Sequence, residues 1–453
     1  MLKKIKEKIS GENSYWIKST FFTISQRLSS LLFGVGSFVL LIKVLDKSDY
    51  GIWTTFLVIA TLLEVSRNGL IKIPLIRFLN NCEEEDKPKI FTASFLINIS
   101  VAFLGAILML CFNDFAAIQL NAPPLASLLT HYAFTTILLS LFFQFEFTQQ
   151  ANMDFQGIFF SYFVRQGTFF LAVVYLLFFE TSLEKLNFLM SAYTLSIALG
   201  TFVSYFYVKH LLHFSRSFEW QWIKQLLNFG KYTFSTSICA VILRSTDQLM
   251  LSSILNPASV ATYNVSVRIA NIIETPSMAI SEVVFPKSVE NMRTKGVEGV
   301  RELYEKSVGV LLALLLPTVI VVLLIPDIII NVTSSGKYSE AIPILQVSVI
   351  ISLLIPPSRQ FANVCDALGK PQWNFYLVLL SAILNLFFNN FFIHAYGIIG
   401  AAYATLLTFA ISVSISNIIL KRTINMSYRN TLLHFKVPYI YFAQKLTGAK
   451  NGK

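Results

Sequence analysis

Long apolar stretches restrict how this chain can fold more than any other feature of its sequence. A membrane-spanning helix needs about 20 mainly apolar residues. The chain is 55% hydrophobic and only 13% charged, whereas soluble domains contain about 25% charged residues. We therefore expect an all-α integral membrane protein. The twelve predicted spans cover residues 18–44, 51–76, 90–112, 124–147, 156–179, 187–208, 230–254, 263–286, 305–330, 341–364, 373–394 and 397–420.

The basic residues are unequally distributed between the two sides of these spans. A net charge of +11 would favour a nucleic-acid partner in a soluble protein. In a membrane protein it reflects the excess of Lys and Arg on cytoplasmic loops. With the N-terminus inside, the outer loops contain only four lysines, Lys43, Lys47, Lys185 and Lys337. This asymmetry predicts that both termini are cytoplasmic, and we expect no nucleic-acid partner.

A weak internal repeat relates the two halves of the chain. At an offset of 210 residues, LDKSDYGIW aligns with LNPASVATY, and SAYTL aligns with AAYAT. Six spans per half place the repeats parallel, which predicts two pseudo-symmetric six-helix bundles around a central cleft. The predicted parts are a cytoplasmic segment (1–17), the first bundle (18–208), a cytoplasmic interfacial linker (209–229), the second bundle (230–420) and a basic cytoplasmic tail (421–453). The tail has two interpretations, an interfacial helix with a frayed end or simple disorder.

Charged side chains inside the predicted spans are the strongest functional signal. Each costs about 2.5–3.5 kcal/mol at the middle of a bilayer. The pairs Arg244/Asp247 and Glu64/Arg67 are three residues apart, so one interpretation is that each pair neutralises itself on one helix face. In the same interpretation, other charged side chains extend along the helix to the inner interface, which is called snorkelling. These residues are Lys72, Arg165, Glu282 and Arg359.

The alternative is a watery cavity with surplus cations, which would bind an anionic substrate. The candidate substrate ligands are then Arg27, Arg67, Arg244 and Arg268. The candidate coupling-ion sites or charge partners are Asp247, Glu64 and Glu274. Amides in the same regions either bind sugars or join helices to one another, and these include Asn98, Gln144, Gln149, Asn385 and Asn389.

Catalytic and metal-binding motifs are missing from the sequence. There is no GxSxG, P-loop or HExxH, and the four cysteines are far apart with no CxxC. We therefore expect no enzymatic activity, no catalytic residues, no metal site and no cofactor. Transport would depend on a proton or sodium gradient, or on the gradient of the substrate itself.

Five short motifs carry a family resemblance. They are KVLDKSDYGIW from Lys43, ILNPASVATYNVSVRIANIIETPSMAISEVVFPKSVE from Ile254, SSGKYSEAIPILQ from Ser334, CDALGKPQWN from Cys365, and NLFFNNFFIHAYGIIGAAYATLLT from Asn385. Together they resemble the polysaccharide-biosynthesis, O-antigen-flippase family. Its superfamily also contains multidrug and toxin extrusion transporters and the lipid II flippase.

The resemblance implies two six-helix bundles and a specific activity. A member would flip an undecaprenyl-diphosphate-linked oligosaccharide from the cytoplasmic to the outer leaflet of a bacterial inner membrane by alternating access. The glycan would serve the synthesis of O-antigen (lipopolysaccharide), capsule or exopolysaccharide. The partners implied are the polyprenyl-linked oligosaccharide, membrane lipids, a polysaccharide polymerase and assembly proteins.

Two other functions compete with this one. An ion-coupled antiporter of drugs or organic cations, with the same fold, would need an acidic cavity in which Asp247 and Glu274 bind the cation. The surplus of arginines in the spans argues against it. A membrane glycosyltransferase or polymerase would need a large outer loop with catalytic acids, whereas the outer loops here are as short as KSDYG and AYG.

Overall fold

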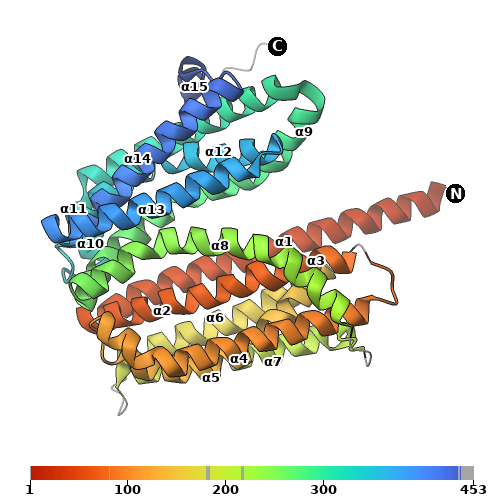
Figure 1. The fold of residues 1–453 in the computed structure, drawn as a ribbon, viewed down its shortest axis with the longest axis horizontal. Coiled ribbons are helices and arrows are strands. Elements are labelled where there is room, and N and C mark those ends of the chain that lie inside the picture. Colours follow the sequence, from red (N-terminus) through yellow and green to blue (C-terminus); the bar gives the residue numbers. More distant parts are fainter. Residues whose placement is uncertain (1, 81, 180–183, 216–218, 437–438, 440–453) are drawn as a thin grey trace. The chain divides into compact units, whose positions relative to one another are not determined.

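The computed structural model describes residues 2–80, 82–179, 184–215, 219–436 and 439, and every regular element among them is a helix. The chain divides into two compact units, unit 1 (Met1–Val241) and unit 2 (Ile242–Lys453). The division falls inside α8 (Trp220–Ile254), and Figure 1 shows the helices of each unit.

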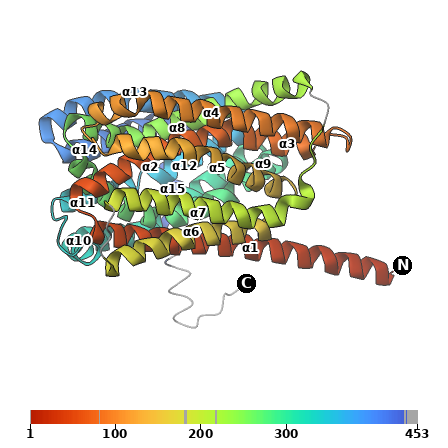
Figure 2. The same cartoon turned by 90° about the horizontal axis from the view of Figure 1, so that it is seen from below.

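Unit 1 is an antiparallel helical bundle. It contains α1 (Leu2–Val44), α2 (Lys47–Arg67), the π-helix η1 (Asn68–Lys72), α3 (Ile73–Asn80), α4 (Lys87–Gln119), α5 (Leu125–Ala151), α6 (Phe155–Phe178), α7 (Lys185–Val208), the short 3₁₀-helix η2 (Lys209–Leu211) and the first part of α8. The closest packing joins α6 to α1 and α7, and α5 to α4 and α7, as Figure 2 shows for α1 and α6.

Local capping sets where some of these helices begin. The Asp46 carboxylate accepts a hydrogen bond from the Asp49 amide (2.7 Å) at the start of α2. The Asp154 carboxylate accepts one from the Gly157 amide (3.1 Å) at the start of α6. Such caps satisfy amide groups that have no partner within the helix.

Unit 2 contains the rest of α8, α9 (Pro257–Leu324), α10 (Pro326–Ser334), α11 (Ala341–Ile351), α12 (Ile355–Ala367), α13 (Pro371–Tyr396), α14 (Ile398–Thr423) and α15 (Tyr428–Phe435). Inside α9, Gly296 has φ 64° and ψ −154°, a conformation that glycine alone adopts without strain. The 68-residue element is therefore two helices that meet at Gly296. Pro356 and Pro357 start α12 after a break from α11, as expected for residues that cannot continue a helix.

Ten helices in the described part of the chain are long and apolar enough to cross a membrane. They coincide with ten of the twelve predicted spans. The other two predicted spans, 51–76 and 263–286, lie on α2 to α3 and inside α9. Each of these two segments carries three charged residues, which lowers its mean hydropathy.

Helices occupy part of the predicted linker and part of the predicted tail. The second half of the predicted interfacial linker (209–229) forms the first turns of α8, which begins at Trp220. The basic tail (421–453) contains α15, and its position at a membrane interface stays a prediction. The rest of the tail lies outside the described residues, except for Tyr439.

Glycines allow η1 and α8 to pack with their backbones in contact. A Cβ atom on Gly230 would lie 2.4 Å from the Leu70 carbonyl oxygen, and one on Gly69 would lie 2.7 Å from the Phe234 Cα. The Thr233 hydroxyl also donates to the Gly69 carbonyl. Small residues permit this kind of close approach between membrane helices.

We expect Gly230→Ala to destabilise the protein by about 1–3 kcal/mol, the usual range for an overpacked site. A melting temperature in detergent, measured by intrinsic fluorescence, gives the size of the effect. The matched control is Gly34→Ala on α1, where an added Cβ has nothing within 4 Å. Equal melting temperatures for the two variants would contradict close packing at this site.

Candidate functional site

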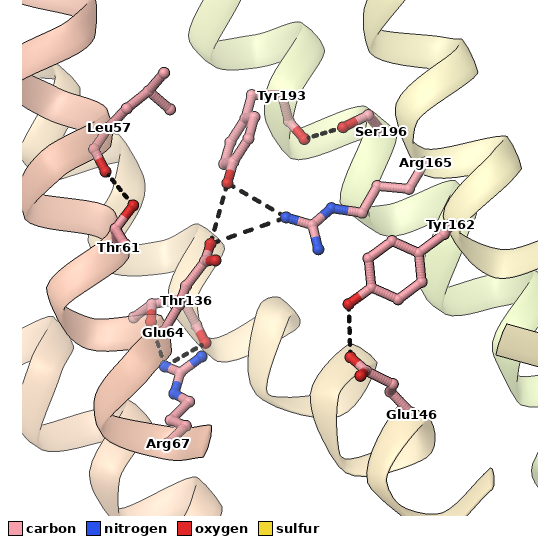
Figure 3. Close-up of polar contacts among 10 residues, drawn as sticks. All are labelled: Leu57, Thr61, Glu64, Arg67, Thr136, Glu146, Tyr162, Arg165, Tyr193 and Ser196. Carbon is pink, nitrogen blue, oxygen red and sulfur yellow. Dashed lines mark hydrogen bonds and ion pairs between the residues drawn. The ribbon is translucent and has the colours of Figure 1, made fainter. Parts of the chain in front are cut away.

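Unit 1 contains a half-buried cluster of a carboxylate, a guanidinium and a phenol, drawn in Figure 3. The Arg165 guanidinium (α6) donates to the Tyr193 hydroxyl (α7) at 3.3 Å, and this hydroxyl donates to the Glu64 carboxylate (α2) at 3.3 Å. Arg165 and Glu64 also form an ion pair at 3.9 Å. The Arg165 guanidinium carbon lies 4.9 Å from the Phe142 ring centroid. Aromatic faces therefore support the cation, and three helices are joined at one point.

A second cluster, of a carboxylate, an ammonium and a phenol, lies in the same unit. The Glu146 carboxylate (α5) accepts from the Lys72 ammonium (η1) at 3.0 Å, and from the Tyr162 hydroxyl (α6) at 2.7 Å, as Figure 3 shows. Both carboxylate oxygens are thus occupied. Lys72 and Arg165 each have an acidic partner on another helix, and their snorkelling to the inner interface stays a prediction. The side chain of Glu282 lies outside the described residues.

We expect Glu146→Gln to lower the free energy of unfolding by about 2 kcal/mol. Loss of one partner of a buried pair costs about 3–5 kcal/mol, and the partial exposure of Lys72 reduces that figure. The double variant Lys72→Met/Glu146→Gln should recover most of the loss, because no uncompensated charge then remains. Melting temperatures of both variants check this, and an equally destabilised double variant would rule out the charge-pair explanation.

Arg67 does not pair with Glu64, so this predicted pair is wrong. Its guanidinium donates to the carbonyl (3.1 Å) and the hydroxyl of Thr136 on α5. The Arg67 side chain is enclosed, with only 1% of the residue exposed. Glu64 contacts Arg165 and Tyr193 instead. Arg67 links α2 to α5 in this conformation, and its Nε and Nη1 atoms are buried without a hydrogen-bond partner among the described residues.

The amides of unit 1 also join helices. Asn98 donates to the Ser140 carbonyl (2.9 Å) and to Gln144 (3.1 Å), and Gln144 donates to Ser94 (2.9 Å). Both amides are fully buried between α4 and α5. Of the two interpretations of these amides, the structure supports helix association.

In unit 2, Asp247 is the centre of a buried hydrogen-bond network and is 5% exposed. Its carboxylate accepts from the Tyr263 hydroxyl, from the Asn389 amide at 2.7 Å and from the Thr405 hydroxyl at 2.7 Å. Asn389 also donates to the Asn385 side chain at 3.0 Å. The predicted pairing of Asp247 with Arg244 is therefore wrong, since neutral donors from α9, α13 and α14 surround the carboxylate.

Arg359 (α12) and Glu274 (α9) form an ion pair at 3.8 Å. The Arg359 Nη1 atom is buried and has no hydrogen-bond partner among the described residues. Arg244 is exposed on α8 and lies within electrostatic range of Glu274 and Arg359. Among the described residues, this region of unit 2 thus places two guanidinium groups near one carboxylate, and Arg359 is the one that contacts it. The snorkelling interpretation of Arg359 stays a prediction.

The remaining two predicted ligands lie apart from these clusters. Arg268 donates from Nε to the Asn264 side chain (3.0 Å), and Asn264 donates to Gln248 (3.0 Å). Arg27 is exposed on α1. Of the seven predicted residues, the structure therefore places Arg27, Glu64 and Arg67 in unit 1 and Arg244, Asp247, Arg268 and Glu274 in unit 2.

Sequence reasoning missed the partners that hold the predicted charges. These partners are Glu146, Tyr162, Tyr193, Tyr263 and Thr405, and Arg165 and Arg359 were set aside. A carboxylate or an arginine in an apolar span was the available signal for Glu146, Arg165 and Arg359. The tyrosines and Thr405 carried no signal of their own, because such residues are common in membrane helices.

These features define a multi-pass, all-helical membrane protein with ion pairs between the helices of each of its units. The model of the polysaccharide biosynthesis protein family matches residues 40–343, and the chain belongs to this family. The resemblance found in the sequence motifs is thereby confirmed.

Two curated relatives and two solved structures are similar to the chain. An uncharacterized membrane protein of Methanocaldococcus jannaschii is 28% identical over 205 residues, 44% of this chain and 39% of that protein. The probable low-salt glycan biosynthesis flippase Agl15 of Haloferax volcanii is 23% identical over 189 residues, 42% and 40% of the two chains. The chain thus matches about two fifths of the length of these relatives.

The structures show the fold. The lipid II flippase MurJ in an inward closed conformation has a TM-score of 0.75 at 16% identity, covering 96% of this chain and 94% of that one. An inward-facing multidrug resistance MATE family transporter of the MOP superfamily has a TM-score of 0.75 at 12% identity, covering 88% and 94%. The protein therefore has the fold that these two transporters share.

Proposed function

We propose that this protein flips a polyprenyl-diphosphate-linked oligosaccharide across the cytoplasmic membrane. The observation that carries the proposal is the grouping of cations in unit 2, where Arg359 pairs with Glu274 and Arg244 lies near both, so that among the described residues two guanidinium groups accompany one carboxylate. A cation in a membrane span is expensive and marks a functional site. A cationic cluster suits a diphosphate and disfavours an organic cation. The family and the relative named as a glycan flippase agree with this substrate class.

Arginine side chains would neutralise the diphosphate during its passage. Moving two negative charges through hydrocarbon without partners would be prohibitive. Arg244, Arg268 and Arg27 are the ligands we propose, and Arg359 joins them through its unpartnered Nη1 atom. Glu274 competes with the diphosphate for Arg359, which would favour release after transport. Arg67 is left with a structural role, because Thr136 and the surrounding protein enclose it.

Asp247 is the proposed site of the coupling ion. Oxygen atoms of Asp247 and Asn385 both accept from the Asn389 amide nitrogen, and Thr405 donates to Asp247, while Asn389 Oδ1 is buried without a partner among the described residues. Hard cations prefer such oxygen donors, and a proton would neutralise the carboxylate. Uptake of a proton or sodium ion here would require the three neutral donors to rearrange. Glu64, already paired with Arg165, is a weaker candidate.

The transport cycle we propose uses twelve spans in two six-helix bundles that alternate in access. The bundle boundaries predicted from the sequence, 18–208 and 230–420, remain part of this proposal. The polyprenyl tail stays in lipid while the sugars pass between the bundles. Both termini are cytoplasmic in this arrangement, as the distribution of lysine and arginine predicts. A polymerase and assembly proteins would then use the glycan in the outer leaflet.

A flipping assay in liposomes tests the function directly. The protein is reconstituted with a fluorescent polyprenyl-diphosphate oligosaccharide, and an impermeant quencher reports the leaflet that holds it. We expect protein-dependent exchange that increases under a proton or sodium gradient. Empty liposomes and a fluorescent lipid without diphosphate are the controls. Transport of cationic dyes with no movement of the glycan lipid would support the antiporter instead.

A further inference from the structure

A cavity of about 500 Å³ opens in unit 1 away from the charged clusters. It lies between the end of α3, the segment before α4 and the first turns of α8, which meet at one end of the unit in Figure 1. Its volume is in the range of small-molecule sites. The lysine and arginine distribution predicts that these segments are cytoplasmic.

Aromatic rings form one wall of this cavity. Phe78 and Trp222 line it, with ring centroids 6.3 Å apart at an interplanar angle of 73°. Phe78 packs in the same edge-to-face manner on Phe229 (6.3 Å, 81°), and the Arg77 guanidinium carbon lies 4.4 Å from the Phe229 ring centroid. These contacts fix the orientation of the rings before any ligand binds.

Polar side chains complete the lining of this cavity. The side chains of Glu83 and Gln225 and the indole N–H of Trp222 make no hydrogen bond to the described residues. Asp86 is held in place by Lys89 at 3.0 Å, and Lys89 also contacts Glu219 at 2.9 Å. The cavity therefore offers hydrogen-bond donors and acceptors that are available to a ligand beside an aromatic surface.

We propose that this cavity binds a sugar unit of the glycan before it enters the transport path. A pyranose ring has an apolar C–H face that packs on aromatic rings, and a rim of hydroxyls that both donate and accept. Trp222 and Phe78 would contact the face, while Glu83 and Gln225 would bind hydroxyls. The two lining carboxylates, Glu83 and Asp86, are accompanied by the lining Arg77 and by Lys89, which pairs with Asp86, and these cations weaken the attraction for an organic cation.

The choice of a sugar rests on the proposed function, but the test does not require transport. Saturation-transfer difference NMR is recorded on the protein purified in a detergent without a sugar headgroup. The probes are the methyl glycosides of glucose, galactose, mannose and N-acetylglucosamine, with choline and phosphoethanolamine as non-sugar ligands. We expect at least one glycoside to bind, and Trp222→Ala to weaken its binding about tenfold. Gln225→Ala should weaken it as well, by a smaller factor.

The matched control is Trp220→Ala, which removes a 58% exposed indole two residues away that does not line the cavity. Size-exclusion profiles and melting temperatures confirm that each variant is folded. Absence of binding by all four glycosides would overturn the proposal, as would equal affinities in the Trp222→Ala and Trp220→Ala proteins. Displacement of the glycoside by choline or phosphoethanolamine would overturn it in favour of a lipid headgroup. A Trp222-dependent sugar site in a protein that fails to flip the glycan lipid would leave this site standing and refute the flippase.

Discussion

Replacement of Asp247 by asparagine is expected to remove the stimulation of flipping by an ion gradient. The substitution keeps the size of the side chain and removes the negative charge of Asp247 from a site lined by Asn385, Asn389 and Thr405. Loss of a full charge partner in a buried site should weaken cation binding by more than about tenfold. The measurement is the initial flipping rate in liposomes, with and without proton and sodium gradients.

The control for this variant is Asp366→Asn, the same chemical change at an exposed position of α12. We expect that variant to respond to gradients like the unmodified protein. Because neutral donors surround Asp247, the asparagine side chain can retain several of its hydrogen bonds, so the protein should still fold. Gradient stimulation that survives in Asp247→Asn would remove Asp247 from the coupling mechanism.

Substitutions of Arg244 should produce a graded loss of transport. We expect Arg244→Ala to reduce flipping by about a hundredfold, because an exposed guanidinium that lies near Glu274 and Arg359 would no longer meet the diphosphate. Arg244→Lys should be intermediate, near tenfold, since lysine keeps the charge but cannot bind phosphate oxygens in a bidentate manner. Flipping rates of the two variants, each normalised to the amount of inserted protein, provide the comparison.

Arg422→Ala is the matched control, because Arg422 is exposed in the last turn of α14 and belongs to neither cluster. It should transport at the rate of the unmodified protein. Wild-type transport by Arg244→Ala would exclude Arg244 as a substrate ligand. An equal loss in Arg244→Lys and Arg244→Ala would instead indicate that the geometry of the guanidinium decides binding.

The positions of the spans were predictable, but the ends of some helices were not. The hydropathy of a sequence locates the segments that lie in the apolar core of a membrane. It does not show whether a helix continues beyond that core into water. The stretch around Lys287 illustrates this, because α9 continues through residues that were expected to form a loop. Pairs three residues apart, Lys287/Glu290 at 2.9 Å and Glu298/Arg301 at 2.7 Å, accompany this helical stretch.

The partners of the buried charges depended on contacts between distant residues. The donors to Asp247 lie 16, 142 and 158 residues away in the chain, so local spacing favoured Arg244 wrongly. For the same reason Glu64 pairs with Arg165 and not with Arg67. Helical spacing identifies which residues share a face, and the fold decides what that face meets.

The π-helix η1 lets the chain between α2 and α3 hold one residue more than a regular α-helix would hold in the same turn. A π-turn contains one residue more than an α-turn, so removal of one residue within Asn68–Lys72 would leave a continuous α-helix in which α2 and α3 keep nearly the same orientation. Contacts on both sides of the segment, Glu64 with Arg165 and Phe78 with Trp222, would then be retained. Gly69 and Lys72 are the positions of the segment that must be kept, because Gly69 packs against the backbone of α8 and Lys72 pairs with Glu146. The gene should therefore accept the loss of one codon here more readily than in the regular helices on either side.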